Sequence, residues 1–383
     1  MGSKSRPCED GRPMLWRESE HEPLSDGFWT AGWAEEALGE LVADAEAAAS
    51  PDGRWPVHPL DEPEEGEQWS GLYAGSAGMA WALWRLGSPF DAAGTIAAAL
   101  DRYRAAPDFT KDPHPPSLLC GETGILVAAE RVGSPAADRA RLRELIRTNR
   151  NHPTWELLWG SPGTMLAARA MGFDDEWRES AALLWAQWDE ESDLWSQDMY
   201  GKVTQYLGSG HGFASNVNAL RGYVTDDELR ERVARLLERL ALRDGDLVNW
   251  PPEPDHPPEK IRVQWCHGAP GIVVTIGDLL PWELALGAGE LTWRAGPLRK
   301  GPGLCHGTAG NGYAFLRLHA LTGDAMWLDR ARRFAVHAVA QVRRERAAVG
   351  RGRYTLFTGD LGVAMFLRAC LDAEPAFPVI DEL

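Results

Sequence analysis

Gly307-Thr308-Ala309-Gly310 stands directly in front of an apolar segment, and this pattern of two glycines separated by two residues recurs along the chain. The six copies begin at Gly75, Gly121, Gly160, Gly268, Gly307 and Gly359. Gly212-Phe213-Ala214-Ser215 is a seventh, degenerate copy, with serine in place of the second glycine. Successive copies lie roughly 40–55 residues apart, which is the spacing of two-helix repeat units. The chain is therefore organised as seven related units.

Each unit combines one apolar and one amphipathic segment. The segments after the glycines are rich in Ala, Leu and Met and often end in glycine, which predicts buried helices with glycine C-caps. Clear examples are 79–87, 125–133, 164–172 and 363–371. More polar segments place apolar residues at steps of three and four, which predicts outer helices with one solvated face. They include 34–49, 135–150, 174–189, 226–242 and 324–346.

This alternation predicts an all-α fold: an (α/α)7 double-barrel toroid with seven inner and seven outer helices. We expect one domain over residues 1–383, with 1–25 flexible or peripheral, and with the glycine turns gathered at one end of the inner ring. An open helical solenoid or two helical bundles would show the same periodicity. We favour a closed ring because cysteines and histidines occupy equivalent positions in different repeats, and a ring would bring those positions together.

The composition bears on which partners the protein can bind and on the compartment in which it is expected. The 383-residue chain has a formal net charge of −17, which disfavours binding to nucleic acid or to an acidic membrane surface. No segment approaches the roughly 20 apolar residues of a membrane span, and the N-terminus lacks the apolar core of a signal peptide. Five cysteines in a chain of this length indicate reduced thiols rather than a disulfide scaffold. We therefore expect a cytoplasmic protein without a membrane span.

Two of the seven units place Cys-His immediately before the first glycine, as Cys266-His267 and Cys305-His306. Zinc readily takes thiolate and imidazole ligands. The two pairs are too far apart in sequence for a compact zinc finger, but equivalent places in adjacent units of a ring are neighbours. The alternative is two buried cysteines beside glycine turns, without a metal.

The motifs WCHGAPGI (265–272) and GLCHGTAGNGYAFL (303–316) resemble the signature of the lanthionine synthetase C-like family. The seven glycine repeats, which extend over nearly the whole chain, are similar to the (α/α)7 fold of that family. The resemblance implies that Cys266, Cys305 and His306 are the ligands of a Zn²⁺ ion. His267 occupies a place that is not a ligand in the family.

The resemblance also implies roles for four residues around the metal. His211, in GSGHGFAS (208–215), matches a histidine of proton transfer, and Arg262 matches an active-site arginine. Glu156 stands where the cyclases carry a catalytic aspartate, and Lys300 matches a lysine that helps to bind glutathione. Both are typical of the stand-alone branch of the family. From the residues alone, His211 could bond a turn, Glu156 could be a solvated helix-start carboxylate, and Arg262 and Lys300 could be exposed charges.

Arg351 or Arg353, just before the last repeat, is expected to be a second anion contact. The implied enzyme adds a thiol, of glutathione or of a peptide cysteine, to dehydroalanine or dehydrobutyrine in a peptide or protein and forms a thioether. Zinc would lower the pKa of the thiol, and His211 would protonate the enolate. Two other classes stay open. One is a non-catalytic zinc-containing adaptor that binds glutathione or peptide, and the other is a carbohydrate-active toroid, which needs paired carboxylates in the mouth of its ring.

Overall fold

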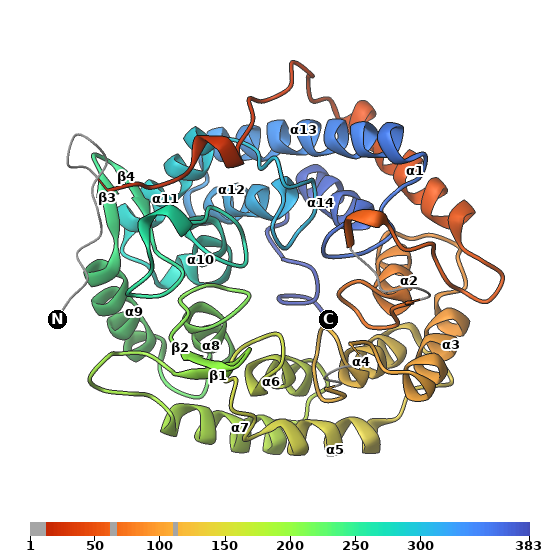
Figure 1. The fold of residues 1–383 in the computed structure, drawn as a ribbon, viewed down its shortest axis with the longest axis horizontal. Helices are drawn as coiled ribbons and strands as arrows, with labels where there is room; N and C mark the ends of the chain where they lie inside the picture. The colour runs from red at the N-terminus through yellow and green to blue at the C-terminus, as the bar shows by residue number, and fades with distance from the viewer. Residues whose placement is uncertain (1–12, 62–66, 110–113) are drawn as a thin grey trace.

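Seven helices form a closed inner ring in the computed structural model, which describes residues 13–61, 67–109 and 114–383. The inner helices are α2 (Ser76–Arg85), α4 (Glu122–Val132), α6 (Ser161–Ala170), α8 (Phe213–Ala219), α10 (Ala269–Ile276), α12 (Thr308–Thr322) and α14 (Asp360–Asp372). Each contacts the next, and α14 contacts α2, so the ring closes (Figure 1).

Seven outer helices alternate with the inner ones along the described chain and surround them (Figure 1). They are α1 (Ala31–Ala48), α3 (Ala92–Ala105), α5 (Arg139–Asn149), α7 (Asp174–Ala186), α9 (Asp226–Leu240), α11 (Trp282–Ala295) and α13 (Ala325–Val349). The first outer helix, α1, packs against the last inner helix, α14. The predicted (α/α)7 toroid is thereby confirmed, and the open solenoid is excluded.

The motif glycines let each inner helix begin close beneath the loop that precedes it. A Cβ on Gly271, the second glycine of its motif, would lie 1.7 Å from the carbonyl oxygen of Trp265, and one on Gly310 would lie 1.7 Å from that of Leu304. Gly268, the first glycine of its motif, has φ +109°, which side chains rarely adopt. Because these glycines have no side chain, each loop can lie directly against the first turn of its helix, and this contact fixes the position of the loop.

The degenerate seventh copy keeps its place in the ring. Helix α8 has only seven residues, and Ser215 stands where the other units have a second glycine. The Ser215 hydroxyl donates to the carbonyl oxygen of Gly212 at 2.9 Å. Helix α8 still contacts α6 and α10, so the ring remains continuous.

Both ends of the described chain contact the ring. Residues 13–25 contain a short 3-10 helix, Glu18–Glu20, and a bridge between His21 and Leu298; residues 1–12 lie outside the described part. The C-terminal segment runs into the middle of the ring (Figure 1). There the ring of Phe377 is buried and stacks on Trp265 with centroids 4.6 Å apart. The interior beneath the loops is therefore filled by side chains.

Two hairpins lie outside the helix pairs. Strands β1 (Gln197–Met199) and β2 (Lys202–Thr204) form one, and β3 (Leu242–Asp244) and β4 (Leu247–Asn249) form the other. The remaining short elements are 3-10 turns, at Pro59–Asp61, Pro258–Lys260 and Gly277–Leu279.

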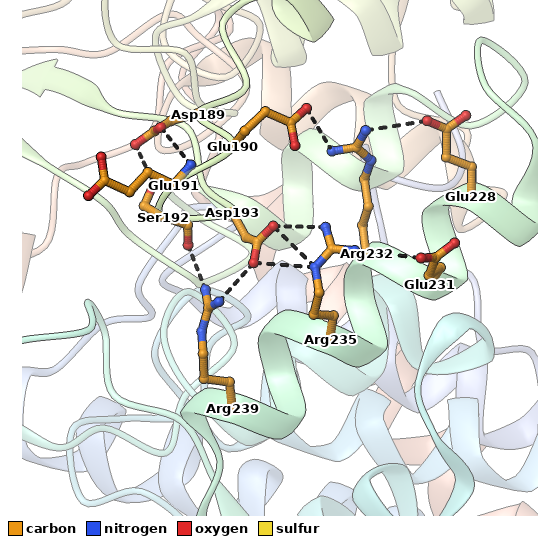
Figure 2. A network of polar contacts seen from close by, with 10 residues as sticks. All are labelled: Asp189, Glu190, Glu191, Ser192, Asp193, Glu228, Glu231, Arg232, Arg235 and Arg239. Atoms are coloured by element: carbon orange, nitrogen blue, oxygen red, sulfur yellow. Dashed lines mark hydrogen bonds and ion pairs between the residues drawn. The ribbon is translucent and has the colours of Figure 1, made fainter.

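A polar network fastens the segment before β1 to helix α9 (Figure 2). The carboxylate of Asp193, almost fully buried, accepts hydrogen bonds from Arg235 and Arg239 at 2.8 Å each. The guanidinium of Arg232 lies over the rings of Trp185 and Trp188, 4.4 and 4.6 Å from their centroids. These contacts hold the approach to the β1–β2 hairpin against an outer helix.

No helix in the described ranges is long and apolar enough to cross a membrane.

Candidate active site

The side chains at the mouth of the ring come from the two positions before the first glycine of each motif. The position two residues before the glycine holds Tyr73, Leu119, Leu158, Gly210, Cys266, Cys305 and Phe357. The position one residue before it holds Ala74, Cys120, Trp159, His211, His267, His306 and Thr358. Because the seven loops gather around one ring, chemically different residues at these equivalent positions meet in space.

Cys266, Cys305 and His306 come together as predicted from their place in the repeat. Their ligand atoms all lie within 4.8 Å of one another, and the two cysteines are buried. The backbone N–H of Cys266 donates to the carbonyl oxygen of Cys305 at 3.1 Å, which ties the two loops together. Two sulfurs and one imidazole within reach of a single ion suit Zn²⁺, and three protein ligands leave a fourth position open, as in catalytic zinc sites.

The two buried thiols shift each other's pKa in opposite directions. A hydrogen bond from Cys266, helped by His306 and Tyr73, holds the pKa of the Cys305 thiol well below its ordinary value against the opposing effect of burial. The same hydrogen bond, together with burial, raises the pKa of Cys266. The Gln264 amide donates to the Cys266 sulfur at 3.0 Å. Cys305 is therefore the first thiol of the pair to ionise.

Tyr73 is a site residue that the sequence analysis did not identify. Its hydroxyl acts on the Cys305 thiol and helps to hold the pKa of that thiol low, and its ring stacks on Phe357 with centroids 5.0 Å apart. Tyr73 stands two residues before Gly75, as Cys305 stands two residues before Gly307. This equivalence between repeats is the sequence feature from which Tyr73 could have been predicted as a site residue.

His211 and Glu156 form a pair in two neighbouring loops. The Nδ1 atom of His211 lies 2.7 Å from the Glu156 carboxylate, whose side chain is fully buried. The backbone N–H groups of Leu158 and Trp159 donate to the same carboxylate at 2.8 and 2.6 Å. Glu156 is thus buried rather than solvated, and the Nδ1 atom of His211 bonds its carboxylate.

The Glu156 carboxylate sets the protonation of His211. Burial lowers the pKa of His211, but the hydrogen bond to Glu156 and the negative charges of Glu156 and Cys305 outweigh it, so this pKa lies above its ordinary value. With Nδ1 facing Glu156, Nε2 is the nitrogen that remains for a substrate. This is the arrangement of a general acid oriented by a carboxylate.

His267 lies beside this pair but outside the metal cluster. Its ring centroid is 5.6 Å from that of His211 and 5.2 Å from that of Tyr206. Burial first, and then the positive charges of His211 and nearby basic residues, lower the pKa of His267 to about 3. Its side chain is therefore a neutral ring in the wall of the site.

A cavity of about 320 Å³ is lined in part by Gln264, whose amide donates to the Cys266 sulfur and so connects the cavity to the metal cluster. Arg262, Arg299 and Lys300 line it, so it carries three cationic groups. Glu20 adds one carboxylate, 3.3 Å from the Arg262 guanidinium. Of the four charged residues that line the cavity, the sequence predicts Arg262 and Lys300 for the site, whereas Glu20 and Arg299 were not predicted.

Arg351 and Arg353 do not line this cavity. One guanidinium nitrogen of Arg351 donates to the carbonyl oxygen of Val57 at 2.7 Å. The Arg353 guanidinium is buried and pairs with the carboxylate of Asp61. A second anion contact by either residue stays a prediction, and Arg353 already has an anionic partner within the chain.

The closed ring of seven helix pairs places the chain among the (α/α)7 toroids. The family model described as lanthionine synthetase C-like protein matches residues 67–382. The chain belongs to this family, as the two cysteine motifs predict.

Relatives and solved structures agree with this assignment. The chain is 33% identical over 141 residues to the LanC-like protein GCL1 of Arabidopsis thaliana. This match covers 34% of this chain and 32% of the relative. The chain is 38% identical over 129 residues to glutathione S-transferase LANCL1 of Danio rerio, and this match covers 32% of each. The matched part thus spans about a third of these curated relatives.

Among solved structures, nisin cyclase has a similar fold, with a TM-score of 0.58 at 14% identity. The superposition covers 90% of this chain and 98% of that protein. At this identity the likeness concerns the fold alone.

Proposed function

We propose that this protein is a zinc-dependent enzyme that adds a thiol to dehydroalanine or dehydrobutyrine in a peptide and forms a thioether. The observation that carries the proposal is the cluster of Cys266, Cys305 and His306 beside the hydrogen-bonded pair of His211 and Glu156. The cluster suits activation of a nucleophile, and the pair suits delivery of a proton. Addition of a thiol across a carbon–carbon double bond needs both.

The residues divide the reaction between them. Bound zinc supplies a Lewis acid that lowers the pKa of a substrate thiol. Attack of the thiolate on the β-carbon moves the electron pair of the double bond onto the enolate of the acceptor. The Arg262 guanidinium stabilises this negative charge. His211 then delivers its proton to the α-carbon, while Glu156 keeps the ring in the orientation that presents Nε2.

The cationic cavity favours glutathione as the thiol donor over a cysteine of the acceptor peptide. Glutathione carries two carboxylates and one ammonium group, which correspond to the cations Arg299 and Lys300 and to the carboxylate of Glu20. A relative at 38% identity is named a glutathione S-transferase. All four cysteines in the described ranges are free thiols, and we propose the reducing cytoplasm as the compartment.

The test is mass spectrometry of a dehydroalanine peptide incubated with the zinc-loaded protein and glutathione. We expect the peptide to gain the mass of one glutathione. Cys305→Ala should abolish this gain and should also lose zinc in elemental analysis, because one of three ligands is removed. Full metal content in Cys305→Ala would refute the metal centre. If the dehydroalanine peptide gains no mass with glutathione, but a peptide with its own cysteine closes a ring, the enzyme is a cyclase. Glutathione binding without either reaction would assign an adaptor.

A further inference from the structure

The mouth of the ring has two chemically different sides. The cavity with Arg262, Arg299 and Lys300 is cationic and is connected to the metal cluster through Gln264. The surroundings of His211 are aromatic: Tyr200 and Tyr206 lie with ring centroids 6.4 and 6.1 Å from its imidazole. Two substrates of different chemistry therefore have separate places to bind.

Three aromatic side chains continue from His211 toward solvent, and we name Phe109, Trp159 and Tyr200 the aromatic wall. The Trp159 indole N–H donates to the Tyr200 hydroxyl at 2.9 Å. Phe109 meets the Trp159 ring edge to face, with centroids 5.7 Å apart. Trp159 stands one residue before Gly160, in the same repeat position as His211 and His306, so the wall begins among the site residues themselves.

The outer two members of the wall, Phe109 and Tyr200, expose large aromatic side chains. Tyr200 is 68% exposed and Phe109 is 37% exposed. Tyr200 and Gly201 form the two-residue turn between β1 and β2, with φ +53° and +75°, as a tight hairpin turn of this type requires. The turn thus presents the Tyr200 ring at the tip of the hairpin. The network of Figure 2 fixes the chain leading to the hairpin that carries Tyr200.

The chemistry of the reaction decides which substrate meets the wall. His211 must reach the α-carbon of the dehydroamino acid, so the acceptor peptide lies against His211. The residues that flank the dehydroamino acid then extend over the neighbouring rings. The thiol donor, with its carboxylates, lies on the cationic side. An apolar, exposed aromatic surface beside His211 suits an apolar side chain of the acceptor.

We propose that Phe109, Trp159 and Tyr200 bind an aromatic or large aliphatic side chain next to the dehydroamino acid and thereby select the acceptor peptide. This inference rests on the proposed function for the identity of the acceptor. It names the substrate class as extended peptide segments in which an apolar residue flanks dehydroalanine or dehydrobutyrine. It assigns to Tyr200 a specificity role distinct from the proton transfer by His211.

Binding is tested first, with peptides that cannot react. Calorimetry compares two peptides with alanine in place of dehydroalanine, one with phenylalanine beside it and one with glycine. We expect the phenylalanine peptide to bind about threefold to tenfold more tightly, the range of one aromatic pair. Tyr200→Ala and Phe109→Ala should reduce this preference to about twofold or less. Tyr200→Phe should keep most of it, because the ring remains.

The matched control is Trp282→Ala. Trp282 is 49% exposed and begins α11, beyond the C-terminal end of α10, whereas the site lies before the N-terminal end of α10. We expect the preference to be unchanged in this variant. Glutathione affinity should stay the same in all four variants, since none touches the cationic cavity.

Turnover then separates this inference from the proposed function. If glutathione adds to dehydroalanine peptides without any preference for phenylalanine, the aromatic wall does not select the acceptor peptide. The proposed function would still stand. A preference in binding without addition to any peptide would overturn the function and keep the wall as a peptide site. A preference that persists in Tyr200→Ala and Phe109→Ala, or a dimer that Tyr200→Ala dissociates in sedimentation, would also overturn the assignment of the wall to the acceptor.

Discussion

At the scale of single residues, the two positions before each motif glycine give the site its chemistry. They hold sulfur at Cys266 and Cys305, imidazole at His211 and His306, and a phenol at Tyr73. The loops occupy equivalent places before the inner helices, so the side chain at these positions determines what each repeat contributes. A substitution there should change the chemistry while leaving the ring intact.

His211→Ala should keep its zinc and fold but slow thiol addition by about a hundredfold or more, because the general acid is lost. The measurement is kcat with glutathione and a dehydroalanine peptide, together with metal content. An unchanged rate would remove His211 from proton transfer.

The pH profile tests the link between His211 and Glu156. The raised pKa keeps His211 protonated to higher pH, so activity that depends on the protonated ring is present below this pKa and lost as pH rises through it. Glu156→Gln removes the negative charge that raises the pKa. The alkaline limb of kcat against pH should therefore move to lower pH. A limb that stays in place would show that Glu156 does not set the protonation of His211.

Lys300→Ala should raise the KM for glutathione by up to about fivefold, the range expected for an exposed charge contact. The KM for a small neutral thiol should hardly change, since it has no carboxylate. Arg230→Ala, on the outer helix α9, serves as the control for a general change in surface charge. Equal weakening of both thiols would argue against an anion contact by Lys300.

At the scale of the elements, the glycine motif determines where each inner helix begins. The sequence predicted apolar helices over 79–87 and 363–371, and the structure extends them toward the motif, as α2 (Ser76–Arg85) and α14 (Asp360–Asp372). The predicted outer segment 226–242 corresponds to α9 (Asp226–Leu240). Hydrophobic periodicity finds the body of a helix, whereas its first turn depends on a contact with the preceding loop that periodicity does not contain.

Gly271→Ala should lower the free energy of unfolding by about 3 kcal/mol or more, because its Cβ would lie 1.7 Å from a backbone oxygen that cannot move without shifting the loop of Cys266. Gly39→Ala is the matched control: Gly39 lies within helix α1, nothing lies within 4 Å of an added Cβ, and alanine is the better helix former. That variant should be about 0.5–1 kcal/mol more stable. Urea unfolding measures both, and equal effects would contradict the role of the motif glycine.

The parts of the site that lie outside the repeats were beyond the reach of the sequence. Cys266, Cys305, His306 and His211 occur in recognisable motifs, so they could be identified. Glu20 reaches the cavity because residues 13–25 run along the rim, and the hairpin that carries Tyr200 is held by a network on an outer helix. Such placements depend on long-range packing that no local pattern encodes.

At the scale of the whole molecule, the interior of the ring supports the mouth. Phe377 stacks on Trp265, the residue directly before Cys266. Phe377→Ala should cost about 3–5 kcal/mol of unfolding free energy and weaken zinc retention, since Trp265 loses its support. Thermal unfolding and chelator competition measure the two effects. Phe28→Ala, at a ring that is 87% exposed, is the control and should change neither.

The contact between α1 and α14 also bears on how the protein is made. Synthesis at roughly 5–20 residues per second separates the emergence of these two helices by on the order of 15–60 s. During that interval the apolar face of α1, with Ala34, Leu38 and Leu41, lacks the partner that covers it in the finished ring. This apolar face therefore stays uncovered on the growing chain until α14 has been synthesised, and a newly made chain can aggregate through it during that interval.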